Sequence, residues 1–429
     1  MNVAVALDAA LESDLLSAVE ANEAELTTLL ATLVRFPSLL GEEACAQDFM
    51  EGLFHSMGLQ TVRFAVDNSE LSHLPGYSPS LGHWHRHDNV VGSHAPREVQ
   101  GRSLIINGHI DVVPVGVEEL WSSPPFDPIV REGRMYGRGA GDMKAGIAAT
   151  VTAFRVLRQL GYQPAGPVCL QSVVEEECTG NGALACLHRG FHADAAVIPE
   201  PFGQTIMHAQ VGVLWLSVEV LGRPAHVMDA RSGINAIEAA FALFQGLKTM
   251  EEEWNAKPHP AFSDHPRPIN INLGKIRGGE WASSVPTRCV MDIRVGFYPG
   301  MGVEQAKQAV ESRLRDTARG DSRLEKVHYR IGYAGFQAEP LLVDTDHPMI
   351  GALGAAHERV FGKPAQLVAS SATTDARFFN LYGSIPATCY GPEANNIHGI
   401  DESVSLTSTL RVTKVLALFM ARWCGLEPA

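Results

Sequence analysis

The chain has 429 residues, of which 45% are hydrophobic and 19% charged, a composition that favours a globular protein of two or three domains and excludes a disordered one. Its 34 basic and 48 acidic side chains give a formal net charge of −14, which disfavours nucleic acid and anionic membranes as partners. Seven scattered cysteines form no C-x-x-C pair, and no apolar run approaches the roughly 20 residues of a membrane span. We therefore expect a cytoplasmic protein.

The first half of the chain predicts alternating helices and buried strands. Apolar residues recur at helical spacing from Leu11 to about Leu59, with a break at Phe36-Pro37-Ser38, and predict two amphipathic helices. Further along, short continuous apolar runs alternate with helical patterns, which indicates an α/β sheet with helical crossovers. The predicted strands are 89–92, 104–109, 168–174 and 195–198, and the predicted helices are 145–160 and 182–188.

An irregular insertion is predicted from Asp67 to His87, where Pro, Gly, Ser and His are frequent. His83, His85 and His87 alternate, so one face of an extended segment could present three imidazoles. We expect a surface loop here rather than a dedicated metal site.

The pattern changes near Thr205 to a strand-helix-strand-strand-helix-strand order that is ferredoxin-like. We predict a small α+β domain, residues 206–335, inserted into a larger α/β domain made of residues 1–205 and 336–429, whose sheet is mixed but mainly parallel and flanked by helices. The predicted elements from here to the C-terminus are strands at 211–220, 269–273, 290–295 and 327–331, helices at 234–250, 303–314, 349–361 and 406–423, and strands near Leu367 and Ala387.

Side chains able to bind metal follow the buried strands. His109 and Asp111 share one face of an extended segment, as in a His ligand oriented by a carboxylate, although an ordinary hydrogen-bonded pair has the same spacing. Asp142 lies in the glycine-rich run 137–146, which could equally cap a helix but contains no phosphate-binding loop motif.

Three consecutive carboxylates, Glu175, Glu176 and Glu177, follow the strand 168–174. Like charges at a strand end are costly unless a cation neutralises them or their pKa values separate, so metal binding or acid-base chemistry is favoured over a solvated cluster. Glu200 follows the next buried strand, and His398 comes late in the chain.

Six motifs in order resemble the di-zinc family that contains acetylornithine deacetylase, succinyl-diaminopimelate desuccinylase, aminoacylase and the folate-cleaving carboxypeptidase. They are GHIDVVP, GRGAGDMKAG, EEECTGNG, PEP, RPAH, and a late IHG followed by Asp401-Glu402. The resemblance covers essentially the whole chain. It implies a zinc-dependent deacylase or amidohydrolase that forms a homodimer through a lid domain, which would be residues 206–335.

The resemblance also implies a role for each residue of the motifs. It makes His109 and Glu200 ligands of a first zinc, Glu177 and His398 ligands of a second, Asp142 the carboxylate bridging both, Asp111 the orienter of His109, and Glu176 the general base. The family usually has Asp-Glu-Glu where this chain has Glu175-Glu176-Glu177. A shifted alignment would make Glu175 the base and Glu176 the ligand. Carboxylate and imidazole ligands suit two Zn²⁺, with Co²⁺ or Mn²⁺ as substitutes.

Four further residues are candidates for contact with a small-molecule substrate. His226 resembles a lid histidine that reaches a neighbouring subunit's site and donates to the developing oxyanion. Asn272 (or Asn270) resembles a carbonyl-binding residue, and Arg294 and Arg377 could bind a substrate carboxylate. Arg294 could instead form a surface salt bridge, and Arg377 could instead be structural.

The expected reaction is hydrolysis of an amide (N-acyl) bond in a small carboxylate-bearing molecule. N-deformylation, dipeptide cleavage and arylamine deamination are the alternatives on the same metal pair, because each needs the same water and base. A non-catalytic binding protein is a remote alternative, since no ligand of the pattern is missing.

Overall fold

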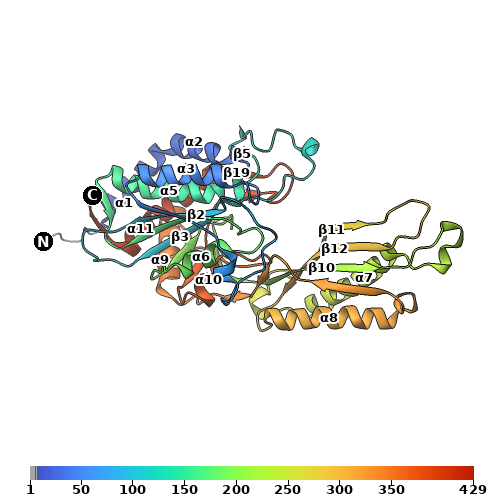
Figure 1. The fold of residues 1–429 in the computed structure, drawn as a ribbon. Coiled ribbons are helices and arrows are strands. Elements are labelled where there is room, and N and C mark those ends of the chain that lie inside the picture. Colours follow the sequence, from blue (N-terminus) through green and yellow to red (C-terminus); the bar gives the residue numbers. More distant parts are fainter. Residues whose placement is uncertain (1–4, 6) are drawn as a thin grey trace.

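The computed structural model describes residue 5 and residues 7–429. Figure 1 shows a larger unit, which contains the first described helix and the C-terminus, and a smaller unit that projects from it. Each unit has its own apolar core, one built around the strand 104–109 and the other around the strand 288–297. Within the described residues, no helix has the length and apolar character needed to cross a membrane.

The larger unit is built on a six-stranded mixed sheet. Its strands are β1 (Gln60–Ala65), β2 (Asp88–His94), β3 (Leu104–His109), β7 (Val168–Val173), β8 (Ala196–Ile198) and β17 (Ala387–Cys389). They lie in the order β1-β2-β7-β3-β8-β17, in which β7, β3, β8 and β17 pair in parallel and β2 runs antiparallel to both of its neighbours, β1 and β7. Every residue of β3 is buried, as its continuous apolar run predicts.

Helices cover both faces of this sheet, which confirms the predicted α/β fold class. They are α1 (Ala9–Ala21), α2 (Glu23–Val34), α3 (Ala44–Ser56), α4 (Asn68–Leu71), α5 (Ala145–Gln159), α6 (Asn181–His188), α9 (Pro348–Phe361), α10 (Ala376–Leu381) and α11 (Leu406–Cys424). In Figure 1, α2, α3 and α5 lie on one side of the sheet and α6 and α10 on the other.

The prediction of two helices before Leu59 was wrong, because the structure has three. Asn22 ends α1 and precedes α2 at once, with φ −95° and ψ 9°. Leu15 and Val19 on α1 and Leu26 and Leu30 on α2 are buried in the same core, so the apolar spacing continues across the break and conceals it.

Small sheets connect the outer parts of the larger unit. One has the order β18-β19-β5-β4 and another β15-β9-β16, and β20 pairs with β6. Their bounds are β4 (Ile129–Arg131), β5 (Arg134–Tyr136), β6 (Tyr162–Pro164), β9 (Ile206–Gln210), β15 (Leu341–Leu342), β16 (Leu367–Ser370), β18 (Ala394–Asn395), β19 (Ser403–Ser405) and β20 (Leu426–Pro428). The pairing of β19 with β5 brings the 137–142 loop next to the segment around His398.

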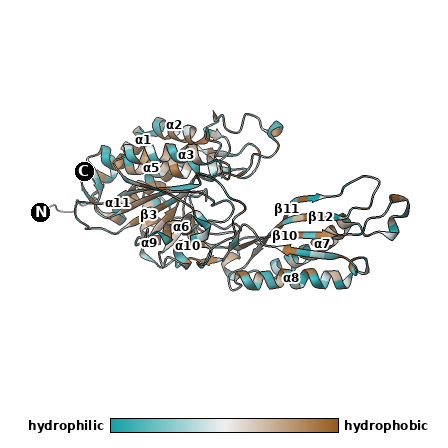
Figure 2. Cartoon of the chain, in the orientation of Figure 1, coloured by the Kyte–Doolittle hydropathy of each residue, from teal (hydrophilic) through white to brown (hydrophobic). Residues whose placement is uncertain are grey.

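The smaller unit is an antiparallel sheet with two helices. Its elements are β10 (Gly212–Leu221), α7 (Ala236–Asn255), β11 (Ile271–Gly278), β12 (Arg288–Phe297), α8 (Val303–Gly320) and β13 (His328–Gly332), and β14 (Gln337–Ala338) pairs with the start of β10. The strand order β11-β12-β10-β13 is the ferredoxin-like one that the sequence pattern predicts. In Figure 2 the outward helix α8 is largely hydrophilic. The limits 206–335 for this domain stay a prediction.

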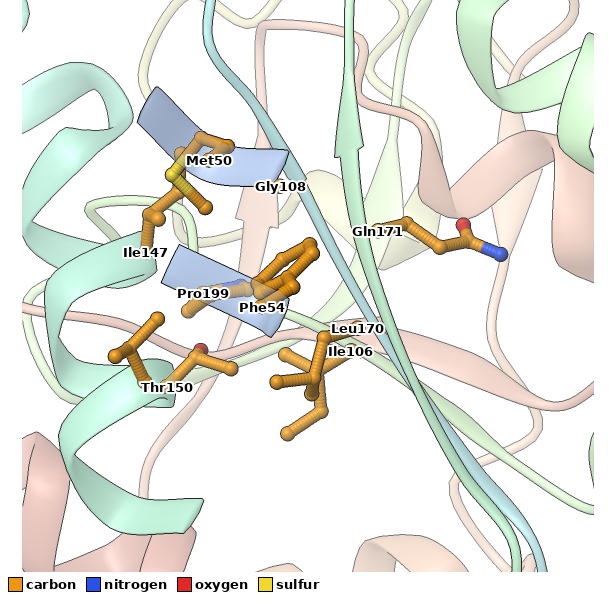
Figure 3. Close-up of a pocket in the computed structure, with 10 residues that line it drawn as sticks. Met50, Phe54, Ile106, Gly108, Ile147, Thr150, Leu170, Gln171 and Pro199 are labelled. Atoms are coloured by element: carbon orange, nitrogen blue, oxygen red, sulfur yellow. The ribbon is translucent and has the colours of Figure 1, made fainter. Parts of the chain in front are cut away.

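A small void of about 10 Å³ lies inside the core of the larger unit (Figure 3). Apolar side chains such as Met50, Phe54 and Ile106 line it, and in Figure 3 the Gln171 amide points away from it. Gly108 and Pro199, which also line it, each precede a candidate metal ligand. The void is therefore a packing defect behind the candidate site, too small for a substrate.

Candidate metal centre and active site

The candidate ligands meet because they follow neighbouring strands of one sheet. His109 ends β3, Glu176 and Glu177 follow β7, and Glu200 follows β8. These three strands are parallel neighbours, so their carboxyl ends lie at the same edge of the sheet, where α/β proteins place their ligands. The loops that carry Asp142 and His398 reach the same edge from outside the sheet.

Asp142 lies between two imidazoles. Its Oδ1 is 3.0 Å from Nε2 of His109, and its Oδ2 is 3.3 Å from Nε2 of His398. On the outer sides, His109 Nε2 is 3.5 Å from Glu200 Oε1, and His398 Nε2 is 3.0 Å from Glu177 Oε2. A carboxylate with one oxygen toward each half of the site has the geometry of a ligand shared by two cations.

Glu176 lies beside the His109 half of this arrangement. Single ligand atoms of His109, Glu176 and Glu200 are within 4.8 Å of one another, and so are those of His109, Asp142 and Glu177. Glu175 points elsewhere, because its carboxylate contacts His87 and Thr179. Of the two alignments left open by the sequence, this geometry favours the one with Glu177 as ligand.

The electrostatics of the cluster fit bound cations. Burial raises the pKa of Glu176 and of Glu200 well above the usual value, and neighbouring carboxylates add to both shifts. Burial alone would lower the pKa of His109, but Glu200 and Asp142 hold it well above its usual value. Buried acidic groups so close together are costly without positive charge, which a divalent cation supplies.

Asp111 supports the site in a way the sequence does not predict. The Nδ1 of His109 is 2.9 Å from the Asp111 backbone oxygen but 3.6 Å from its carboxylate, so the backbone carbonyl is the acceptor for the ring. The Asp111 carboxylate instead accepts the backbone N–H groups of Glu176, at 3.4 Å, and Glu177, at 3.1 Å. Burial raises the pKa of Asp111 to about 7.

Glu402 holds the loop that carries Asp142. Its Oε1 accepts the backbone N–H groups of Gly141, at 2.9 Å, and Asp142, at 3.1 Å. Its Oε2 accepts from Arg138 Nη1 at 2.5 Å, and both side chains are buried. The buried ion pair therefore fixes the backbone from which Asp142 projects.

Arg138→Met is expected to destabilise the protein by about 3–5 kcal/mol, because it leaves the buried Glu402 carboxylate without its counter-charge. Urea unfolding would measure the change in the free energy of unfolding. The matched control is Arg323→Met, which removes the exposed ion pair of Arg323 with Asp321 and should change stability little. Equal effects of the two substitutions would contradict this account of the pair.

Two buried groups near the site escape the sequence analysis. The prediction of a surface loop holds for His83 and His85, which are exposed, but is wrong for His87. His87 is 6% exposed, and its ring bridges Glu43 Oε2, at 3.1 Å, and Glu175 Oε1, at 2.9 Å. Alternation along one segment cannot reveal partners contributed by other elements.

The second such group is Asp375, which is fully buried at the start of α10. Neither of its carboxylate oxygens has a hydrogen-bond partner among the described residues, and burial raises its pKa to about 6. Its charge adds to the raised pKa of Glu176. Asp375 lies in the run Thr373-Thr374-Asp375-Ala376-Arg377, in which only Arg377 was predicted as a site residue.

The ion pairs of His87 should stabilise the folded protein less as the pH becomes alkaline. Burial alone would lower the pKa of His87, but Glu175 and Glu43 raise it to about 10. A His with a raised folded-state pKa contributes its full stabilisation below the unfolded value of about 6.5 and loses it as the pH rises through the folded value. The unfolding free-energy difference between wild type and His87→Gln should therefore shrink from about pH 6 to about pH 10. A constant difference would contradict a charged His87.

The four candidate substrate residues are dispersed. His226 is exposed beyond the end of β10, where its Nδ1 accepts the Met228 N–H at 3.1 Å. The segment after β10 lies at the end of the smaller unit farthest from the larger unit in Figure 1. Within one chain, His226 is therefore not brought to the metal ligands.

Asn272 and Arg294 are opposite each other on β11 and β12. Asn272 is exposed, whereas burial lowers the pKa of Arg294 to about 10. The Arg294 guanidinium donates to the backbone oxygens of Ser371, at 2.7 Å, and Asn270, at 3.3 Å. Arg294 thus connects the smaller unit to the larger one.

Arg377 is fully buried beside residues 175–181, the turn after β7 that we call the glutamate turn. It donates to the backbone oxygens of Thr179, at 2.8 Å, and Thr374, at 2.9 Å, and its guanidinium lies 4.1 Å from the centre of the Phe378 ring. These contacts match the structural alternative that the sequence left open for Arg377.

An α/β sheet with carboxylates and imidazoles gathered at its carboxyl edge fits a metal-dependent hydrolase. Residues 105–422 match the model of peptidase family M20/M25/M40, and the chain belongs to this family. It is 30% identical over 432 residues to the N-formyl-4-amino-5-aminomethyl-2-methylpyrimidine deformylase of Bacillus subtilis (strain 168), covering 95% of this chain and 96% of that one. The protein of the same name from Halalkalibacterium halodurans is 28% identical, with 97% and 98% covered.

Solved structures share the fold. A di-peptidase from Saccharomyces cerevisiae matches with a TM-score of 0.79 and 12% identity, covering 96% of this chain and 98% of that one. A dinuclear metal-binding peptidase of the family from Bacillus subtilis matches with a TM-score of 0.60 and 16% identity, covering 94% and 99%. Together with the ligand clusters described above, the family supports a di-metal site.

Proposed function

We propose that this chain hydrolyses an amide bond with two Zn²⁺ ions, for which Co²⁺ or Mn²⁺ could substitute. The observation that carries the proposal is Asp142, whose two oxygens face His109 and His398 separately. His109 and Glu200 would hold one ion, Glu177 and His398 the other, and Asp142 both. When bound, such a pair lowers the pKa of a water toward ~7 and polarises the substrate carbonyl.

Glu176 is the proposed general base. Its carboxylate takes a proton from the attacking water and then delivers it to the departing nitrogen, so that the amide yields an acid and an amine. Asp111 keeps Glu176 in place through the backbone N–H group that its carboxylate accepts. Burial and neighbouring carboxylates raise the pKa of Glu176, which favours its taking up the proton of the water.

The proposed substrate is the formamide of an aminomethylpyrimidine, as named for the two full-length relatives. The contacts of the arginines support this deformylase alternative over a carboxylate-bearing substrate. Arg294 and Arg377, on which carboxylate recognition depended, donate to backbone carbonyls. Both guanidinium groups therefore already have backbone partners within the chain.

A hydrolysis screen tests the substrate. We expect release of formate from N-formyl-4-amino-5-aminomethyl-2-methylpyrimidine at a higher kcat/KM than any hydrolysis of N-acetyl or N-succinyl amino acids or dipeptides. The matched variant is Arg294→Lys, which should leave the formamide reaction nearly unchanged. A strong preference for an N-acyl amino acid, lost in Arg294→Lys, would restore the carboxylate-bearing substrate.

We also propose a cytoplasmic homodimer that forms through the smaller unit. His226 is exposed at the far end of that unit, so it could serve only a site of the partner subunit, where it would donate to the developing oxyanion. Mixing inactive His226→Ala and Glu176→Gln chains should restore part of the activity, since some mixed dimers would contain one intact site. Absence of restored activity in confirmed mixed dimers would contradict this role.

A further inference from the structure

The segment between β1 and β2, residues 66–87, contacts the glutamate turn at two separate points. At one end His87 binds Glu175 at 2.9 Å. Near the middle, the backbone N–H of Ser78 donates to Asn181 Oδ1 at 3.2 Å, and Asn181 Nδ2 donates back to the Ser78 oxygen at 2.9 Å. Glu175 and Asn181 lie on either side of the two residues proposed as base and ligand.

The same segment also binds the chain where it returns from the smaller unit. The Gln337 N–H donates to Ser78 Oγ at 3.0 Å, and the Gly335 N–H donates to the Pro79 oxygen at 2.7 Å. Ser78 is fully buried. One segment therefore contacts both the glutamate turn and the linker whose strand, β14, pairs with β10.

Glu175 needs this support because its backbone is in an unfavourable conformation. Its φ is +64°, which L-residues with a side chain rarely adopt without strong constraints. Its backbone oxygen accepts the N–H groups of Cys178, Thr179 and Gly180, which closes the turn. The Glu175 side chain is held by His87. His87 is held in turn by Glu43, the N-cap residue of α3, at 3.1 Å.

We propose that residues 66–87 are a positioning element: His87 holds Glu175 in the conformation that presents Glu176 and Glu177, and Ser78 and Pro79 connect this turn to the smaller unit. The Asp111 carboxylate accepts the N–H groups of Glu176 and Glu177, so the turn is held from both sides. The inference rests on the proposed function of Glu176.

The test compares His87→Gln with His85→Gln, an exposed control on the same segment. Both full-length proteins are loaded with Zn²⁺, their metal content is measured, and kcat and KM are determined for the pyrimidine formamide. We expect His87→Gln to lower kcat roughly 10–100-fold per metal-loaded chain with little change in KM, as for residues that orient metal-site groups. His85→Gln should match the wild type.

Amide hydrogen exchange gives a second result that needs no activity. The N–H groups of Cys178, Thr179 and Gly180 should exchange faster in His87→Gln than in His85→Gln, while those of α11 stay protected. If His87→Gln does not fold, His87→Gln/Glu175→Gln also removes the Glu175 carboxylate that lost its partner, and it should show the same faster exchange. Unchanged exchange at the turn, or an unchanged kcat with only a lower Tm, would overturn the proposal. A wild type that hydrolyses no tested compound would refute the proposed function alone, because the exchange result would still decide the role of His87.

Discussion

Glu176→Gln is expected to lower kcat by ~10²–10⁴-fold, the usual contribution of a positioned general acid or base. The amide keeps the size of the side chain but cannot accept the proton of the attacking water. Glu176 is 6% exposed and lies in one cluster with His109 and Glu200, so no bulk base can replace it easily. Metal content and Tm should stay close to those of the wild type.

The control for this variant is Glu119→Gln, which makes the same chemical change on an exposed residue and should leave kcat unchanged. Steady-state hydrolysis and metal analysis of both proteins give the answer. Full activity in Glu176→Gln would show that another group takes the proton. Loss of a metal instead of activity alone would favour the shifted alignment, in which Glu176 is a ligand.

Asp142→Asn should lower activity at least as much as Glu176→Gln does, because it weakens the binding of both metal ions. Mutating a residue that supports a metal ligand typically lowers metal affinity or activity by ~10–100-fold. Removing the charge of a ligand shared by two ions should therefore lower metal affinity by more than ~10²-fold. The asparagine offers one oxygen and one NH₂ group, which cannot face both His109 and His398 as two acceptor oxygens do. Both ions should be lost together.

Asp127→Asn is the matched control, because Asp127 is exposed in the preceding loop. Zn²⁺ titration followed by calorimetry measures the affinity of each protein. Retention of one tightly bound ion in Asp142→Asn would contradict a shared ligand and would indicate two independent sites.

The sheet and its edge could be predicted because buried parallel strands have a distinct pattern. The apolar run of β3 ends at His109, and the run of β7 ends at the glutamates, so the ligands of one edge follow from strand order alone. The inserted ferredoxin-like order was equally visible, because strands exposed on one face alternate.

Contacts between distant segments could not be predicted in this way. Burial of His87 depends on Glu43 from one side and Glu175 from the other, and no local pattern pairs them. Arg294 was predicted to bind a carboxylate or to form a surface salt bridge, but it donates to backbone oxygens, one of them that of Ser371, 77 residues away in the sequence. Every residue has a backbone oxygen, so the acceptor of such a bond cannot be identified from its residue type.

The central claim is a two-metal hydrolase with Asp142 shared between the ions. The most direct measurement is a titration of chelator-stripped protein with Zn²⁺, in which bound metal per chain and formate release from N-formyl-4-amino-5-aminomethyl-2-methylpyrimidine are followed together. The account predicts binding that saturates at two ions per chain, with hydrolysis rising alongside it and absent from Asp142→Asn. Full hydrolysis by the stripped protein, or saturation below one ion per chain, would contradict it.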